Sequence, residues 1–92
     1  MKIKTQIQHL ISEILIANTI DLKRSLGNQT IELFKQANLI NNTPVAIKLN
    51  TTLELKEAID NFCINDNLTN RDALNNILES INQLLVDDKI AS

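Results

Sequence analysis

The chain has 92 residues, of which 43% are hydrophobic, 22% are charged and only two are aromatic, and its formal net charge is −2. With one glycine and one proline, it has too little turn chemistry for a sheet of many strands, so long helices joined by few turns are predicted. The sequence excludes an internal disulfide, because it holds a single cysteine, and a membrane-spanning helix, because no apolar run approaches the required length of roughly 18 to 20 residues.

The first helix is predicted over residues 3–17, where apolar residues recur at steps of three and four. These residues are Ile3, Ile7, Leu10, Ile11, Ile14 and Leu15. A second helix is predicted over residues 20–38. Asn18 and Thr19 offer an N-cap before it, and Asp21 places a negative charge in its first turn, where the free N–H groups and the helix dipole favour one.

The apolar stripe of the second helix is interrupted by one glycine. The stripe comprises Leu22, Leu26, Leu33, Phe34 and Ala37. Thr30 fills the missing apolar position, and Gly27 lies inside the pattern at an expected penalty of about 1 kcal/mol relative to alanine. Because the stripe keeps its phase across Gly27, we predict one continuous helix, with a kink at this glycine as the alternative.

The clearest joint precedes the third helix, which is predicted over residues 44–64. Pro44 disfavours a helical conformation at Thr43, so Thr43 is predicted to be the N-cap and Pro44 the first helical residue. The expected apolar positions are Val45, Leu49, Leu53, Ile59, Phe62 and Cys63.

A polar joint at residues 65–67 separates the third helix from the fourth, which is predicted over residues 70–85. Thr69 and Asp72 have the spacing of a cap followed by an acidic third position. The apolar stripe that follows is the most regular in the chain and comprises Leu74, Ile77, Leu78, Ile81, Leu84 and Leu85. Residues 86–92 are predicted to be a short tail.

Joints this short make successive helices antiparallel, so we predict an all-α fold, a single domain over residues 1–92 that forms an up-down-up-down four-helix bundle. Residues 1–48 carry six Lys or Arg against three Asp or Glu, and residues 49–92 carry three against eight. Helices of opposite charge attract one another, which is our interpretation of this split. The acidic second half disfavours nucleic acid as a partner there.

The residue types that carry chemistry are few. His9 has no second His, Cys or inward-facing carboxylate at helical spacing that could complete a metal site, so we expect a surface position. Cys63 shares an apolar face with other core residues and is expected to be a buried hydrophobe rather than a nucleophile. Glu54, Glu57 and Asp60 are interpreted as a solvated helix face, with an acidic docking strip as the alternative.

An enzyme of the helical chorismate mutase type would bind an anion with cationic side chains that point into the bundle. The cationic residues here, Arg24, Lys35, Lys48 and Arg71, fall outside the predicted apolar stripes. The sequence also contains no glycine-rich phosphate loop and no nucleophile elbow. We therefore predict a non-catalytic binding protein, a monomer with no catalytic residue, no cofactor, no metal and no small-molecule substrate. Since its N-terminus lacks the apolar stretch of a signal peptide, we place it in the cytoplasm.

The second half of the chain resembles a known family. Thr43 and Pro44, followed by Leu49 and Leu53 five and nine residues after the proline, a short polar joint and an amphipathic helix to Leu85, resemble the immunity proteins of pediocin-like (class IIa) bacteriocins, of the enterocin A immunity type. The resemblance extends over nearly the whole chain as four helices of matching order and length.

The resemblance implies a cytosolic antiparallel four-helix bundle that protects a cell from the secreted peptide, by engaging the membrane subunits of the mannose phosphotransferase permease once the bacteriocin has bound them from outside. It also places recognition in the C-terminal half, at the third joint and the tail. By position, the candidate specificity residues are Asn65, Asp66, Asn67, Asp87, Asp88, Lys89 and Ile90. A helical antitoxin, or an adaptor that sequesters a protein partner, is the alternative function.

Overall fold

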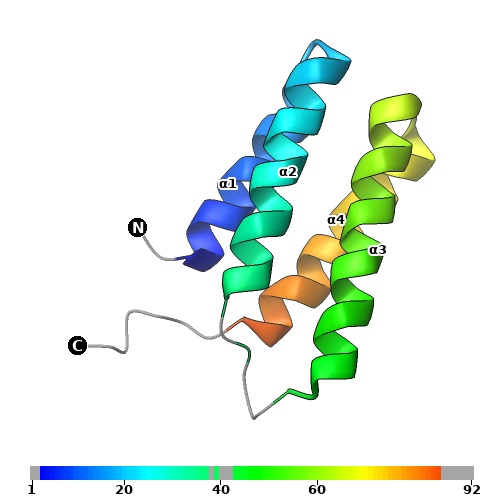
Figure 1. Ribbon diagram of the computed structural model, residues 1–92. Helices are drawn as coiled ribbons and strands as arrows, with labels where there is room; N and C mark the ends of the chain where they lie inside the picture. Colours follow the sequence, from blue (N-terminus) through cyan, green and yellow to red (C-terminus); the bar gives the residue numbers. More distant parts are fainter. Residues whose placement is uncertain (1–2, 38, 40–42, 86–92) are drawn as a thin grey trace.

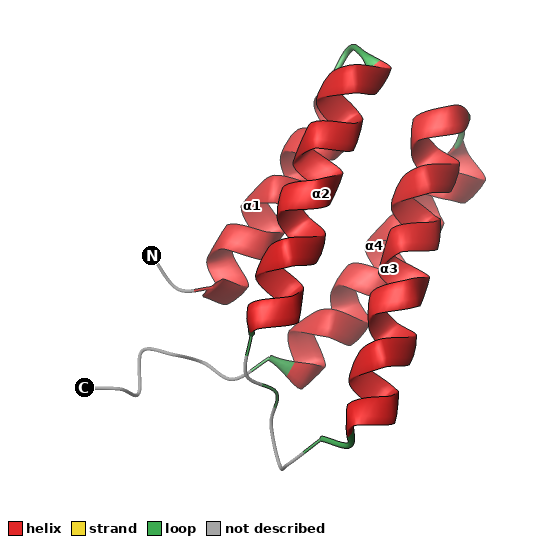
Figure 2. Cartoon of the chain, in the orientation of Figure 1, coloured by secondary structure: helices red, strands yellow, loops and turns green. Residues whose placement is uncertain are grey.

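The computed structural model describes residues 3–37, 39 and 43–85 of the chain. Four helices run in the order α1 (Ile3–Ile16), α2 (Ile20–Gln36), α3 (Val45–Ile64) and α4 (Leu68–Leu84), as Figure 1 shows. Within these residues no strand forms, as Figure 2 shows. Leu39 and Leu85 form an isolated antiparallel bridge. The prediction of an all-helical fold with four helices is therefore confirmed.

Each helix packs against the next one in the chain, and α1 also contacts α4. The α1–α2 turn and the α3–α4 turn lie at the same end of the molecule in Figure 1, and the longer α2–α3 connection lies at the other end. We call the first of these the turn end and define it as residues 16–20 and 64–68. The core lies between the four helices. Its largest fully buried side chains are Phe34, Phe62, Ile7, Ile11, Ile14, Leu55, Leu74, Ile81 and Thr30.

Local capping explains where α2 and α4 begin. Thr19 caps α2 as predicted, since its Oγ1 accepts a hydrogen bond of 3.1 Å from the backbone N–H of Leu22. The cap predicted at Thr69 is wrong: Asn67 caps α4 by accepting a hydrogen bond of 2.8 Å from the N–H of Asn70. Asparagine is a stronger N-cap than threonine, so the helix begins two residues earlier than expected, at Leu68.

The start of α3 also differs from the prediction by one residue. Pro44 itself occupies the N-cap position, with φ −58° and ψ 145°, and the helix begins at Val45. The carbonyl of Pro44 accepts hydrogen bonds from the N–H groups of Ile47 (3.0 Å) and Lys48 (3.2 Å). Thr43 is therefore not the N-cap residue, because Pro44 has the non-helical ψ of the N-cap position.

Helix α2 is continuous through its glycine, as predicted. A Cβ at Gly27 would lie 2.5 Å from Cγ2 of Ile59, so the glycine allows α2 and α3 to approach closely. One turn later, Thr30 is fully buried, and its Oγ1 donates a hydrogen bond of 2.8 Å to the carbonyl of Leu26. Thr30 thus fills an apolar position, as expected, because its hydroxyl is satisfied within its own helix.

The predicted apolar stripe of α3 is wrong in its first half. Val45, Leu49 and Leu53 are 83%, 58% and 56% exposed, whereas Thr51 and Thr52 are buried. The reason is helical phase: successive residues turn by about 100°, so the nine residues from Leu53 to Phe62 place the two side chains on opposite sides of the helix. Phe62 faces the core, and Leu53 therefore faces outward.

The stripe of α2 needs a similar correction at its N-terminal end. Leu22, which was predicted to face the core, is 48% exposed, and its neighbour Lys23 is 7% exposed. Lys23 lies three residues before Leu26, in step with Thr30 and Phe34, so helical phase directs it inward. The buried lysine is a feature of the turn end.

Candidate recognition surface at the turn end

The predicted joint residues form a closely bonded turn between α3 and α4. Asn65 ends α3 by donating its N–H to the carbonyl of Asn61 (2.9 Å), and its own carbonyl accepts from Nδ2 of Asn70 (2.7 Å). Asn67 caps α4, as described above. Residues 65–67 are all exposed. Hydrogen bonds of Asn65 and Asn67 therefore hold the turn. The side chain of Asp66 takes no part in these bonds and binds residues of α2 and α4.

Asp66 joins two cations from other elements. Arg71 on α4 donates from Nε to Oδ1 (2.8 Å) and from Nη2 to Oδ2 (3.1 Å) of the carboxylate, and Lys23 on α2 lies with its Nζ 3.4 Å from Oδ2. The same Nη2 of Arg71 also donates to the carbonyl of Leu15 in the last turn of α1 (3.1 Å). We call Lys23, Asp66 and Arg71 the charged clasp. It links α1, α2 and α4 to the joint.

The ring of Phe62 lies beside both cations of the charged clasp. Nζ of Lys23 is 4.5 Å from the ring centroid, and Cζ of Arg71 is 5.3 Å from it. Both distances are in the range of cation–π attraction, which is worth about 0.5 to 2 kcal/mol per contact. The Lys23 side chain is only 9% exposed, and its ammonium is tolerated there because it faces both a carboxylate and an aromatic ring.

The charged clasp depends on the ionised form of Asp66. The pKa of this carboxyl is lowered, first because Arg71 hydrogen-bonds to it, with further lowering from the charge of Arg71 and from Lys23. A carboxyl whose pKa is lower in the folded state stabilises the fold above its unfolded pKa, and this contribution is lost as the pH falls through the folded value. The clasp is therefore complete at neutral pH and weakens in acid, below about pH 4.

Large aliphatic side chains surround the charged clasp on the outside of the turn end. Ile64 and Leu68, which flank the joint, are 74% and 73% exposed, and Ile16 and Ile20 at the other turn are 77% and 52% exposed. The contacts of Arg71 with Leu15 and of Lys23 with Asp66 hold the two turns together. The turn end thus presents exposed aliphatic side chains beside charges that are held by hydrogen bonds.

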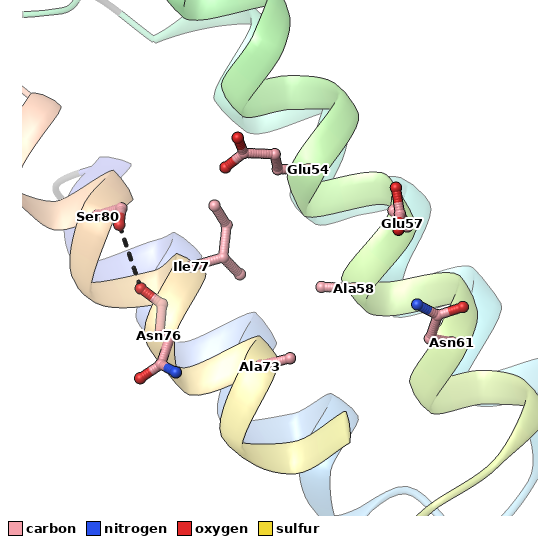
Figure 3. Close-up of a pocket in the computed structure, with 8 residues that line it drawn as sticks. All are labelled: Glu54, Glu57, Ala58, Asn61, Ala73, Asn76, Ile77 and Ser80. Carbon is pink, nitrogen blue, oxygen red and sulfur yellow. Dashed lines mark hydrogen bonds between the residues drawn. The ribbon is translucent and has the colours of Figure 1, made fainter. Parts of the chain in front are cut away.

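A second surface lies between α3 and α4, and we call it the α3–α4 hollow (Figure 3). Its volume is about 410 Å³. Ala58 and Ala73 face each other across it, and their short side chains leave the gap open. Glu54 and Glu57 line it from α3, and Ile77 from α4. On its α4 side, Oγ of Ser80 donates to the carbonyl of Asn76 (3.3 Å).

The α3–α4 hollow gathers two of the three carboxylates of the predicted acidic strip. The third, Asp60, lines a separate depression on the side of α3 that faces α2. The residues that line the hollow include no cation, and it therefore offers carboxylate and amide oxygens to a ligand but no paired acid and base. The acidic docking strip remains a prediction, now limited to Glu54 and Glu57.

His9 and Cys63 lie where the sequence predicts. The side chain of His9 is 65% exposed, and its Nε2 is 2.9 Å from Oε1 of Glu13 one turn further along α1. Cys63 is 3% exposed, and burial raises the pKa of its thiol, which favours the protonated form. Across the part of the chain that the structure describes, His, Cys, Asp and Glu side chains form no group of three that could hold a metal ion.

The four predicted specificity residues of the tail, Asp87, Asp88, Lys89 and Ile90, lie outside the described residues. Of the predicted set, the structure brings together Asn65, Asp66 and Asn67 at the turn end. In the described ranges, no helix is both long enough and apolar enough to cross a bilayer.

The sequence interpretation missed the partners of Asp66. Lys23 was not considered, Arg71 was placed only outside the apolar stripes, and Phe62 was predicted only as an apolar position of the third helix. A signal for Lys23 was present, because it continues the spacing of Leu26 and Thr30 on one helical face. No comparable signal exists for Arg71, whose contacts depend on how α1 and α4 meet.

The sequence matches no known family, no curated protein and no solved structure.

Proposed function

We propose that this chain is an immunity protein that protects its cell from a pediocin-like bacteriocin, by binding the bacteriocin-engaged mannose phosphotransferase permease from the cytosolic side. In this proposal the four helices alternate in direction as an up-down-up-down antiparallel bundle. The protein acts by occupying a surface of the permease, and the turn end is the part of the bundle that makes the contact.

One observation carries this proposal: the joint at residues 65–67 lies between two exposed aliphatic side chains, Ile64 and Leu68. Large side chains that become buried on binding supply most of the affinity of a protein interface, and polar groups around them supply orientation. Residues 65–67 are the described part of the specificity region that the sequence resemblance implies. The exposed side chains and the resemblance thus both support the joint as a contact site.

The charged clasp supports the proposal because it cross-links the two turns of the turn end. Arg71 is bonded to both Asp66 and the carbonyl of Leu15. A surface that is already ordered before binding loses less conformational entropy when its partner arrives. Asp87, Asp88, Lys89 and Ile90 of the tail stay part of the proposed specificity region; they follow Leu85, which pairs with Leu39 at the end of α4 opposite the turn end.

A helical antitoxin or an adaptor that sequesters a protein partner is the second candidate. The α3–α4 hollow favours it, because a partner enclosed by this protein needs contacts on more than one face, and Glu54 and Glu57 would attract a basic segment there. This function also uses exposed aliphatic residues and no catalytic group. An experiment in cells separates the two candidates.

The test is to express the chain in a bacteriocin-sensitive strain and to add a panel of pediocin-like peptides from outside. We expect survival to increase against at least one peptide of the panel. Unchanged killing by every peptide, with the protein present at high level in the cell, would contradict the immunity function and favour the antitoxin or adaptor.

The contact surface is tested with the double variant Ile64→Ser and Leu68→Ser, which we expect to lose protection because both side chains are lost from the interface. The matched control is Ile47→Ser, which removes a 45% exposed isoleucine of α3 away from the turn end. Thermal unfolding of each purified variant checks that it is folded. Equal protection by the double variant and the control would show that the turn end is not the contact surface.

The specificity region is tested by exchanging residues 65–92 with those of another immunity protein. We expect the exchange to transfer protection to the peptide that the other protein recognises. Protection that instead follows residues 1–64 would contradict the assignment of specificity to the joint and the tail.

A further inference from the structure

The outward face of α3 carries a line of apolar side chains that the bundle does not use. Val45, Leu49 and Leu53 follow one another at intervals of four residues and are 83%, 58% and 56% exposed. Residues four apart lie one above the other on a helix, so the three side chains form a continuous ridge. The ridge is remote in sequence from the joint at residues 65–67.

A groove runs beside this ridge, between α2 and α3. It consists of two hollows of about 350 and 190 Å³, which share Lys35, Leu49 and Thr52 in their linings. Ile31 of α2 and Leu53 of α3 line the larger hollow, and Val45 lines the smaller one. We call the two together the α2–α3 groove. Its apolar lining comes from both helices.

Positive charge predominates around the α2–α3 groove. Lys35, Lys48 and Lys56 line it, and Glu32 is the acidic residue among its lining. Nζ of Lys48 donates to the carbonyls of Lys35 (2.7 Å) and Ala37 (2.9 Å) at the end of α2, which holds its charge in place without neutralising it. Among the described residues, neither Lys35 nor Lys56 takes part in an ion pair.

We propose that the α2–α3 groove binds an acidic amphipathic helix of a partner protein. From Val45 to Lys56 the groove wall is about 17 Å long, which accommodates about three turns of a helix. Apolar side chains of the partner would pack against Leu49, Leu53 and Ile31, as in other helix-in-groove complexes. Its carboxylates would lie beside the three lysines, which provide the matching charge.

The internal packing of α3 supports a binding role for this face. Thr51 and Thr52 are buried, whereas Leu49 and Leu53 of the same segment are more than half exposed, and Thr52 satisfies its hydroxyl by donating to the carbonyl of Lys48 (2.8 Å). Folding alone favours the opposite placement, with leucine inside. Departures from local folding preference are characteristic of functional surfaces.

This groove is a different surface from the turn end and does not depend on the proposed function. Its test uses the purified full chain and a fluorescent synthetic helix of about four turns, with leucines at steps of three and four and glutamates on both flanks. A second peptide keeps the leucines and replaces every glutamate by lysine. We expect saturable binding of the acidic peptide and at least tenfold weaker binding of the basic peptide.

Two variants of the protein locate the binding. Leu49→Ser together with Leu53→Ser should weaken binding of the acidic peptide at least tenfold, because the apolar ridge is lost. Lys35→Glu together with Lys56→Glu should weaken it about fivefold at low salt and less at high salt, where charges are screened. Ile47→Ser and Lys4→Glu, which do not line the groove, are the matched controls and should bind as the native chain does.

Several results would overturn the proposal. Absence of saturable binding of the acidic peptide up to millimolar concentration would do so, as would equal binding of the two peptides or equal weakening in the control variants. Binding of phosphatidylglycerol vesicles, but not of the peptide, through Leu49 and Leu53 would identify a membrane surface instead. Self-association that Leu49→Ser abolishes in sedimentation, again without peptide binding, would identify a second copy of the chain.

Discussion

The two sides of α3 solve the same packing problem in opposite ways. On the α2 side, Gly27 lets the backbone of α2 come against Ile59. Two depressions also lie along this side, one lined by Asp60 and Ile64 and the other the apolar and cationic α2–α3 groove. On the α4 side, Ala58 and Ala73 leave the α3–α4 hollow, whose border is acidic. A small residue therefore gives a close helix contact where a large side chain lies opposite, as Ile59 does at Gly27. It leaves a gap where another small residue lies opposite, as Ala73 does at Ala58.

The largest expected effect tests this difference directly with two isoleucine truncations. Ile59→Ala should lower the free energy of unfolding by about 3 to 4 kcal/mol, because it leaves a cavity under the tight α2–α3 contact. Ile77→Ala should lower it by only about 2 to 3 kcal/mol, because Ile77 is 7% exposed at the border of the open hollow, whereas Ile59 is 2% exposed and packs against the backbone of α2 at Gly27. Urea denaturation measures both, and equal values would show that the two sides of α3 are packed alike.

The next largest effect concerns the glycine. Gly27→Ala should destabilise the native chain by about 1 to 3 kcal/mol, since the new Cβ would overlap Cγ2 of Ile59. In the Ile59→Ala background that atom is absent, and the same substitution should stabilise by up to about 1 kcal/mol, the helix propensity of alanine over glycine. A double-mutant cycle in urea measures the change of sign. If Gly27→Ala has the same effect in both backgrounds, the close approach at Ile59 is not the reason for the glycine.

A smaller effect of opposite sign is expected in the α3–α4 hollow. Ala73→Leu should stabilise the chain by about 1 kcal/mol, because the larger side chain covers apolar surface in space that is empty. Ala46→Leu adds the same group at an exposed position of α3 that borders neither surface, and should change the stability by less than about 0.5 kcal/mol. Thermal unfolding compares the two variants. Destabilisation by Ala73→Leu would mean that the hollow cannot accept a side chain.

The smallest effect concerns the turn end, where the charged clasp joins Lys23 of α2 and Arg71 of α4 to Asp66. Asp66→Asn should be less stable than the native chain at pH 7. The difference should shrink as the pH falls below about 4, because Asp66 of the unfolded chain then takes up a proton before the folded carboxylate does, whose pKa is lowered by Arg71. Urea midpoints of both proteins from pH 7 to pH 3 measure this convergence. A constant difference over that range would show that the charge of Asp66 does not hold the clasp.

The candidate site was predictable to the extent that it is local. The joint at residues 65–67 follows from clustered asparagine and aspartate between two apolar patterns, and its exposure needs no tertiary information. The partners of Asp66 are another matter, because Lys23 is 43 residues away along the chain. Its burial depends on which face α2 turns toward Phe62, and that orientation is set by the packing of both helices.

Within the chain itself, short-range physics accounts for the four helices: apolar steps of three and four, the cap at Thr19, and a proline that starts α3. Short-range physics does not decide which face of α3 packs into the core. Apolar residues lie on all sides of this helix, so their spacing is compatible with more than one buried face. The contact of Ile59 with Gly27 selected one of them and left Leu49 and Leu53 in water. Local bonds set where a helix begins, whereas the shape of its neighbours sets which way it turns.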